Sequence, residues 1–174
     1  MSLSPALVVV AALLVIAGAA KLRNPQLARA ALETARLPGG IAAVRLAGAV
    51  EIAVGAVCIV RPDRVAELGV AGLYLVFAFV VASQIRSGSE LTSCGCLGAI
   101  DAPPAWAHVG FNLAAAAVGC TAAIAGSSGL LQLAAEHPVG GLVVLLGTVA
   151  ATRLAVVVFT DLPGVLAVYR RPTR

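Results

Sequence analysis

The residues of this chain best suited to chemistry are two cysteines separated by one glycine, Cys94-Gly95-Cys96. Two thiols at this spacing can close a small disulfide ring, and glycine permits the unusual backbone angles that such a ring requires. Strain in a ring of this size makes the disulfide easier to reduce, which suits transfer of a disulfide rather than scaffolding. The first hypothesis for the pair is therefore a dithiol that cycles between its reduced and oxidised forms.

Two other interpretations of the cysteine pair stay open. A structural zinc ion takes four ligands and the pair supplies two, with Asp101 and His108 as the nearest residues that could complete the set. Because this set is poor, we predict no metal site. The third interpretation is a structural or incidental pair without redox chemistry.

The composition of the chain predicts that lipid is its solvent. Of its 174 residues, 60% are hydrophobic and 11% are charged, whereas about a quarter of residues are charged in soluble domains. A helix needs roughly 20 apolar residues to cross the hydrocarbon. Five segments meet this requirement, at about residues 3–20, 40–60, 66–85, 107–125 and 139–160. We predict an all-α polytopic membrane helix bundle, one membrane domain over residues 1–174, with a four-helix core and a fifth transmembrane helix.

Three shorter segments join these spans. Residues 25–37 are predicted to form an amphipathic interfacial helix, because Arg29 and Glu33 recur at helical spacing and Asn24-Pro25 is a typical helix start. This helix could act as a lid or be an ordinary connection. Residues 86–106 are predicted to be a polar loop that holds the cysteine pair, and residues 126–138 a linker.

Polar residues within the predicted spans gather toward one membrane face. Counting crossings places the loops after the first and third spans, and the C-terminus, on a face that we call side A; the N-terminus and the other loops face side B. The polar residues that lie in the spans or at their ends, between mid-membrane and side A, are Lys21, Arg45, Glu51, Gln84, His108, Asn112 and Arg153. Since a charged side chain inside a membrane is costly and by default marks a site, we predict a polar pocket beneath the cysteine loop.

The members of this pocket have different expected roles. The predicted catalytic residues are Cys94, Cys96, Glu51 and Arg45, and the predicted pocket residues are Lys21, His108, Asn112 and Arg153. Glu51 is too short and too deep to reach the interface, so it either handles protons or forms a structural pair with Arg45 or Lys21. Arg45 and Arg153 could instead extend to the interface. His108 could be an interfacial residue, and Asn112 a helix-packing residue.

One face of the second span combines glycines with the buried carboxylate. Gly48, Glu51, Gly55 and Cys58 follow one another at spacings of three, four and three, so they share a helix face. This pattern predicts close helix packing or room for a ligand. Cys58 and Cys120 both lie toward side B. They could form a second redox pair or be small apolar residues of the helix interior.

Three segments resemble a known family. Ala17-Gly18-Ala19-Ala20-Lys21-Leu22-Arg23-Asn24-Pro25, then Glu51-Ile52-Ala53-Val54-Gly55, then Ser93-Cys94-Gly95-Cys96-Leu97-Gly98 before a span bearing Asn112, are similar to the MauE group of DoxX-like membrane proteins, over about residues 3–125. The resemblance implies a helical bundle that acts in thiol or disulfide maturation of exported proteins with a thioredoxin-like partner. Phe111-Asn112 stands where the family usually has Arg-Asn, so the resemblance implies the same stabilisation of an anion or thiolate only if Arg45 or Arg153 substitutes for that arginine.

These observations lead to two main hypotheses of function. The first is a membrane thiol–disulfide oxidoreductase that exchanges electrons with a thioredoxin-like or other thiol protein; a quinone between helices near Glu51 is the one cofactor considered. The second is a non-catalytic assembly or accessory subunit of a membrane redox complex, and whether the chain is an enzyme stays open. A small transporter ranks lowest, because the spans show no paired half-repeats. No nucleic-acid partner is expected, since the cations flank the spans.

The distribution of cations predicts an orientation in the bacterial cytoplasmic (inner) membrane. Outside the spans, eight Lys and Arg residues lie on side A and two on side B. This excess predicts that side A, and with it the Cys94-Gly95-Cys96 loop, faces the cytoplasm. A role on exported substrates instead favours a cysteine loop that faces away from the cytoplasm. If only four spans cross the membrane, the Lys and Arg residues outside them divide five against five between the two sides.

Overall fold

The computed structural model describes residues 4–87 and 104–160. Within these residues the structure consists of seven helices and no strand. In chain order they are α1 (Ser4–Arg23), α2 (Pro25–Thr34), α3 (Ile41–Val60), α4 (Arg64–Arg86), α5 (Trp106–Ala125), α6 (Leu130–Glu136) and α7 (Pro138–Thr160). Five of them, α1, α3, α4, α5 and α7, are long and apolar enough to cross a membrane. The predicted all-α polytopic membrane bundle is confirmed.

Local signals explain where several helices begin and end. The Asp63 side chain caps α4 by accepting a hydrogen bond from the Ala66 backbone N–H at 2.8 Å, which satisfies one of the free donors of the first turn. At the start of α5, His108 Nδ1 accepts a hydrogen bond from the Ala105 N–H at 3.1 Å. After α5, Gly126 takes a φ of 74°, which glycine adopts without steric cost.

The segment after α1 forms the amphipathic helix α2. Pro25 occupies its first turn, where the missing N–H costs nothing. Ala28 and Ala31 are buried against the bundle, while Arg29 and Glu33 form an exposed ion pair of 2.7 Å. The helix ends at Thr34, three residues before the predicted end, and Arg36 then adopts a φ of 57°, which turns the chain toward α3.

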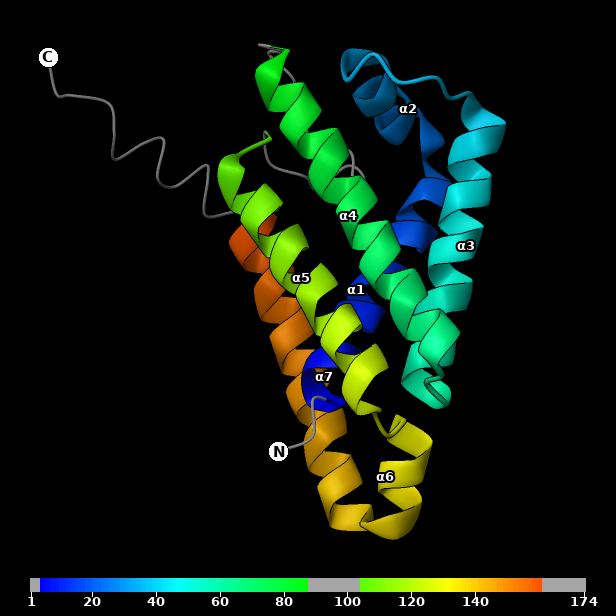
Figure 1. The fold of residues 1–174 in the computed structure, drawn as a ribbon, viewed down its shortest axis with the longest axis vertical. Coiled ribbons are helices and arrows are strands. Elements are labelled where there is room, and N and C mark those ends of the chain that lie inside the picture. The colour runs from blue at the N-terminus through cyan, green and yellow to red at the C-terminus, as the bar shows by residue number, and fades with distance from the viewer. Residues whose placement is uncertain (1–3, 88–103, 161–174) are drawn as a thin grey trace, which may run out of the picture.

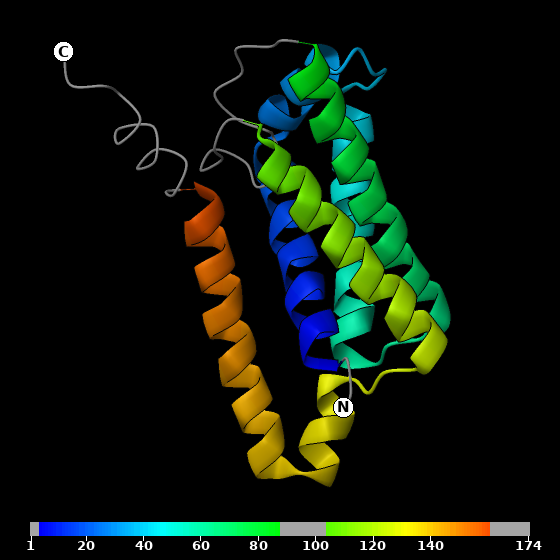
Figure 2. The ribbon, with the colours of Figure 1, turned by 60° about the vertical axis from the view of Figure 1, so that its left-hand side comes forward.

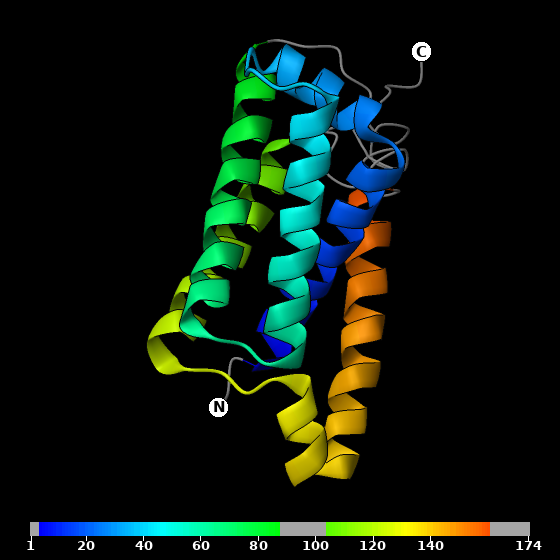
Figure 3. The ribbon, with the colours of Figure 1, turned by 90° about the vertical axis from the view of Figure 1, so that its right-hand side faces the viewer.

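The four-helix core consists of α1, α3, α4 and α5, which run alternately up and down (Figure 1). The most extensive contacts join α1 to α3 and α4 to α5, and α2 lies across the end of the bundle near α3 and α4 (Figure 3). Leu7 and Leu14 of α1 and Val70 of α4 are buried in the core. The hydroxyl of Tyr74 on α4 donates a hydrogen bond of 2.7 Å to the Val10 carbonyl of α1, which ties the two helices together.

Glycines let α1 and α3 approach closely. A Cβ added at Gly48 would lie 2.8 Å from the Gly18 carbonyl oxygen, and one added at Gly55 would lie 2.6 Å from the Ala11 carbonyl oxygen. Both distances are too short for any side chain. The predicted shared face of Gly48, Glu51, Gly55 and Cys58 is buried, so close helix packing is confirmed. Cys58 lies in the core and Cys120 on the surface, both as free thiols.

The fifth long helix lies beside the core. Residues 126–138 were expected to be a linker, but they contain α6, whose last turn leads directly into α7. From there α7 returns along α1, as Figure 2 shows. Most of its large apolar side chains are exposed: Val139, Leu142, Val143, Leu145, Leu146, Val149, Leu154, Val157 and Val158. Such a surface suits contact with lipid.

Candidate functional site

The centre of the candidate site is a buried ion pair between α1 and α3. Lys21 Nζ lies 2.8 Å from Glu51 Oε2, and the two residues are only 8% and 1% exposed. Lys21 is in the last turn of α1, and Glu51 is near the middle of α3. The close contact of Gly18 with Gly48, one turn from each charged residue, brings the two helices near enough for the pair to form.

An aromatic side chain from a third helix completes the surroundings of the lysine. Lys21 Nζ lies 4.8 Å from the centroid of the Phe77 ring on α4, a distance at which a cation is attracted to the ring face. Removing two charges from water costs several kcal/mol per ion unless each finds a partner. Here the carboxylate, the ammonium and the ring compensate one another, so a charged pair can persist inside the membrane-spanning bundle.

A small cavity of about 130 Å³ adjoins the Lys21–Glu51 pair. Its remaining walls are apolar and come from three helices: Ala28, Ala31 and Leu32 of α2, Ala43, Val44 and Ala47 of α3, and Val76, Phe77 and Val80 of α4. Gln84 of α4 is fully buried, and its Nε2 donates a hydrogen bond of 3.1 Å to the Ala31 carbonyl. This bond joins α4 to α2, which forms one wall of the cavity beside the charged pair.

The two predicted pocket residues on α5 are buried, but they do not line this cavity. His108 is 8% exposed and Asn112 is 6% exposed. The His108 ring is engaged at the start of its own helix through its bond from Ala105. Phe111, the neighbour of Asn112 on α5, packs edge-on against Tyr74 with ring centroids 6.2 Å apart. The Phe111 side chain packs against the hydrophobic core of the bundle.

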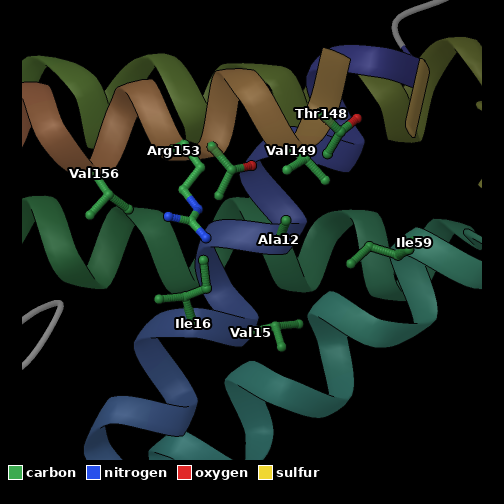
Figure 4. A pocket seen from close by; sticks show the side chains of 9 residues that line it. Ala12, Val15, Ile16, Ile59, Thr148, Val149, Arg153 and Val156 are labelled. Carbon is green, nitrogen blue, oxygen red and sulfur yellow. The ribbon is translucent and has the colours of Figure 1, made fainter. Parts of the chain in front are cut away.

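The two arginines predicted to join Glu51 lie elsewhere. Arg45 is exposed on α3; it precedes Glu51 by six positions, which at about 100° per residue places it about 240° around the helix from the carboxylate. Arg153 is also exposed and lines a separate cleft between α7 and α1 (Figure 4). Of the predicted cations, Lys21 is therefore the one that the structure pairs with Glu51.

The predicted catalytic cysteines, Cys94 and Cys96, lie outside the described residues, as does Asp101. The helix ends that flank this segment are described. The guanidinium of Arg86, at the end of α4, lies 5.9 Å from the centroid of the Trp106 ring at the start of α5. Within residues 4–87 and 104–160, no three His, Cys, Asp or Glu side chains are grouped so that they could hold a metal ion.

Sequence reasoning missed a second buried carboxylate. Glu67, in the first turn of α4, is 3% exposed and accepts a short hydrogen bond from the Ser127 hydroxyl, which follows α5. The pair joins α4 to the chain after α5 at the end of the bundle opposite Lys21. An acidic residue in a first helical turn is common at helix starts, so nothing in the sequence distinguished Glu67 from an ordinary exposed residue.

Comparison with known proteins identifies the family. The family described as methylamine utilisation protein MauE matches residues 2–126, a range that contains α1 to α5. No match was found among curated proteins or among solved structures. Because the match spans more than half of the chain, and the structure has five helices able to cross a membrane, this multi-pass membrane protein belongs to the MauE family.

Proposed function

We propose that this protein is a membrane thiol–disulfide oxidoreductase in which Cys94 and Cys96 form the redox-active pair. The observation that carries the proposal is the buried Lys21–Glu51 pair. Lys21 lies in the last turn of α1, and α1 ends at the end of the bundle where α4 ends and α5 begins (Figure 1). In the sequence, the two cysteines stand between α4 and α5. A compensated charge pair in a membrane span is a costly feature that favours a functional site.

The proposed reaction is an exchange of disulfides with a thiol protein. A thiolate of the partner attacks the Cys94–Cys96 disulfide and forms a mixed disulfide, and the cysteine that leaves takes up a proton. The second thiol of the partner loses its proton and attacks the partner's own sulfur in the mixed disulfide; this releases the remaining cysteine of the pair, which takes up a proton. The partner thereby loses two electrons and two protons and gains a disulfide, while the cysteine pair becomes a dithiol. An oxidised thioredoxin-like protein restores the disulfide by the reverse exchange.

Glu51 is assigned to proton handling in this proposal, and Lys21 positions it. Residues of α2 form one wall of the cavity beside the pair, and the carboxylate itself is only 1% exposed. Under this proposal, Glu51→Gln slows disulfide exchange more strongly than it lowers partner binding, since a glutamine side chain holds no proton to transfer. Slowed exchange with an unchanged Michaelis constant for the partner supports the assignment, and unchanged exchange contradicts it.

The cavity beside the Lys21–Glu51 pair is small for a quinone, and we propose no quinone step there. Pockets for ligands of this class are typically about 300–1,000 Å³, whereas the cavity beside Lys21 and Glu51 is about 130 Å³. The proposal therefore routes no step through a quinone at this position. A thiol protein outside the bundle is the partner that the proposed chemistry requires.

Redox titration of the purified protein, with mass-tagging of free thiols, tests the proposal directly. Wild type is expected to show one two-electron transition that disappears in Cys94→Ser and Cys96→Ser. The surface thiol Cys120 supplies the matched control, since Cys120→Ser should leave the transition in place. Disulfide exchange at the wild-type rate in the double variant Cys94→Ser/Cys96→Ser would eliminate this function.

For the location we propose the bacterial cytoplasmic membrane with side A, and the cysteine pair, toward the cytoplasm. The support is the excess of Lys and Arg outside the spans on side A. Labelling of Cys94 and Cys96 with a membrane-impermeant maleimide should succeed in inverted vesicles and fail in intact cells. Labelling from the outside of intact cells would reverse the assignment.

A second candidate function, an accessory subunit of a membrane redox complex, is favoured by α7. This helix exposes a long apolar surface and lies beside the core, so it could pack against another membrane protein. The accessory function predicts that a larger complex copurifies with the chain and survives Cys94→Ser/Cys96→Ser. The oxidoreductase function predicts that activity is lost in the same variant whatever copurifies.

A further inference from the structure

Outside the Lys21–Glu51 site, a cleft lies between α7 and the core. Its volume is about 510 Å³, within the range of pockets that hold small ligands. It is lined by Ala12, Val15 and Ile16 of α1, Ile59 of α3, and Thr148, Val149, Thr152, Arg153 and Val156 of α7. Figure 4 shows these side chains converging from α7 and α1 on one space. Most of this wall is aliphatic, so it suits a hydrocarbon chain.

Two threonines of α7 bring buried hydroxyls to this apolar wall. Thr148 and Thr152 are each 7% exposed, and neither hydroxyl oxygen has a hydrogen-bond partner among the residues that the structure describes. An unsatisfied buried hydroxyl is costly and uncommon. The two residues are one helical turn apart, so their hydroxyls present donors about 6 Å apart along the cleft. A ligand with acceptor oxygens would satisfy both.

Arg153 supplies a positive charge to the same cleft. Its guanidinium extends from α7 toward α1 beside Ile16 (Figure 4), and within residues 4–87 and 104–160 no carboxylate forms an ion pair with it. Arg153 is seven residues from the end of α7, about 10 Å below it on side A. From this depth an arginine can reach the level of lipid headgroups. A cation at this position, with no carboxylate paired to it among the described residues, favours the binding of an anionic group.

We propose that the cleft between α1 and α7 binds an anionic phospholipid from the side A leaflet. Arg153 pairs with the phosphate, Thr152 and Thr148 donate hydrogen bonds to the ester oxygens below it, and one acyl chain lies along Ala12, Val15 and Ile59. A neutral amphiphile would leave Arg153 without a counter-charge. A zwitterionic lipid would bring its own cation to compete for the phosphate. The lipid would bind α7 to the core, and this site does not depend on the cysteine pair or on Glu51.

Native mass spectrometry of the full chain in a mild detergent tests the proposal. Delipidated wild type is titrated with phosphatidylglycerol and, separately, with phosphatidylcholine of the same acyl chains. The expected result is one bound phosphatidylglycerol, with an affinity about tenfold or more above that for phosphatidylcholine. Equal affinities for the two lipids in wild type would overturn the proposal without any variant. So would retention of a neutral quinone in the cleft in place of the lipid.

Three variants locate the lipid. Arg153→Gln should remove the preference for phosphatidylglycerol, and Thr148→Val/Thr152→Val, which keeps the side-chain shape, should weaken binding of both lipids severalfold. Arg45→Gln is the matched control, because Arg45 is also an exposed arginine of a span toward side A but lies outside the cleft. An unchanged preference in Arg153→Gln, or an equal loss in Arg45→Gln, would show that the lipid does not bind in this cleft.

Discussion

The chain holds charge inside its membrane spans in two contrasting ways. The Lys21–Glu51 pair lies inside the four-helix core, where each charge has its partner at 2.8 Å and almost no exposed surface. Arg153 lies at the edge of the core on α7, with two unsatisfied hydroxyls nearby and no ion pair among the described residues. The first site is complete within the protein. The second needs a molecule from outside to be complete.

The difference follows from how each helix pair packs. Glycines at the crossing of α1 and α3 let the two backbones come into contact. The crossing of α1 and α7 has no such contact between glycines: Gly147 of α7 has nothing within 4 Å of its would-be Cβ. A cleft of about 510 Å³ results there. Tight packing thus favours a pair within the protein, and loose packing favours a ligand.

Breaking the internal pair should have the largest effect on stability. Lys21→Met leaves Glu51 buried without a counter-charge, and Glu51→Leu does the same to Lys21. Each is expected to lower the free energy of unfolding by about 3–5 kcal/mol, the usual cost of removing one partner of a buried pair. Reversible unfolding in mixed micelles would measure this loss.

The double variant Lys21→Met/Glu51→Leu tests whether both single variants lose stability through the same ion pair. Since it removes both charges together, it should be markedly more stable than the sum of the single losses predicts. Additive losses would mean that the two residues act independently, and the contrast with Arg153 would then lose its basis.

The next effect concerns the glycine contact that makes the core tight. Gly48→Ala places a Cβ about 2.8 Å from the Gly18 carbonyl oxygen, so α1 and α3 must move apart. A loss of about 1–3 kcal/mol is expected, as for other overpacked positions, and thermal unfolding would measure it. Gly147→Ala on α7 is the control; because nothing lies near that position, alanine should be neutral or raise stability by up to about 1 kcal/mol. Equal losses at both positions would contradict the packing contrast.

A smaller effect is expected from the hydrogen bond that ties α4 to α1. Tyr74→Phe keeps the ring and its contacts but removes the hydroxyl that donates to the Val10 carbonyl. The expected loss is about 0.5–1.5 kcal/mol, measured by the same unfolding experiment. Thr121→Val should cost less, because the exposed Thr121 hydroxyl only donates to carbonyls of its own helix. A larger loss for Thr121→Val would place the stabilising bonds on the surface.

Sequence patterns predicted the fold well because hydrophobic length and helix signals are local. The five apolar segments, the charged face of residues 25–37 and the small-residue face of Gly48, Glu51 and Gly55 all correspond to features of the structure. The helix α6 was missed because its seven residues, between Gly129 and Pro138, carry no pattern that distinguishes a short helix from a linker.

The composition of the site was predicted only in part, because depth in the membrane does not say which helix face a residue occupies. Counting crossings placed Lys21, Glu51, Arg45 and Arg153 toward the same membrane face, and it could not tell which of them would meet. Rotation about the helix axis then separates them: Glu51 faces α1, while Arg45 is exposed and Arg153 lines another cleft. Phe77 was missed because an aromatic residue in an apolar span has no sequence signal for contact with a cation.

The smallest expected effect tests whether the depth of a charge in the membrane or its burial in the core explains the contrast between Lys21 and Arg153. Arg45→Gln removes a cation that lies toward the same membrane face as Lys21 but is exposed, so its charge can already reach the interface and no partner is left alone. No measurable change in the free energy of unfolding is expected. If Arg45→Gln destabilised the protein as much as Lys21→Met, the depth of a charge in the membrane would determine how much it contributes to the free energy of unfolding. If Arg45→Gln has no effect, that contribution depends instead on whether the charge has a partner within the core, as Lys21 has and, among the described residues, Arg153 has not.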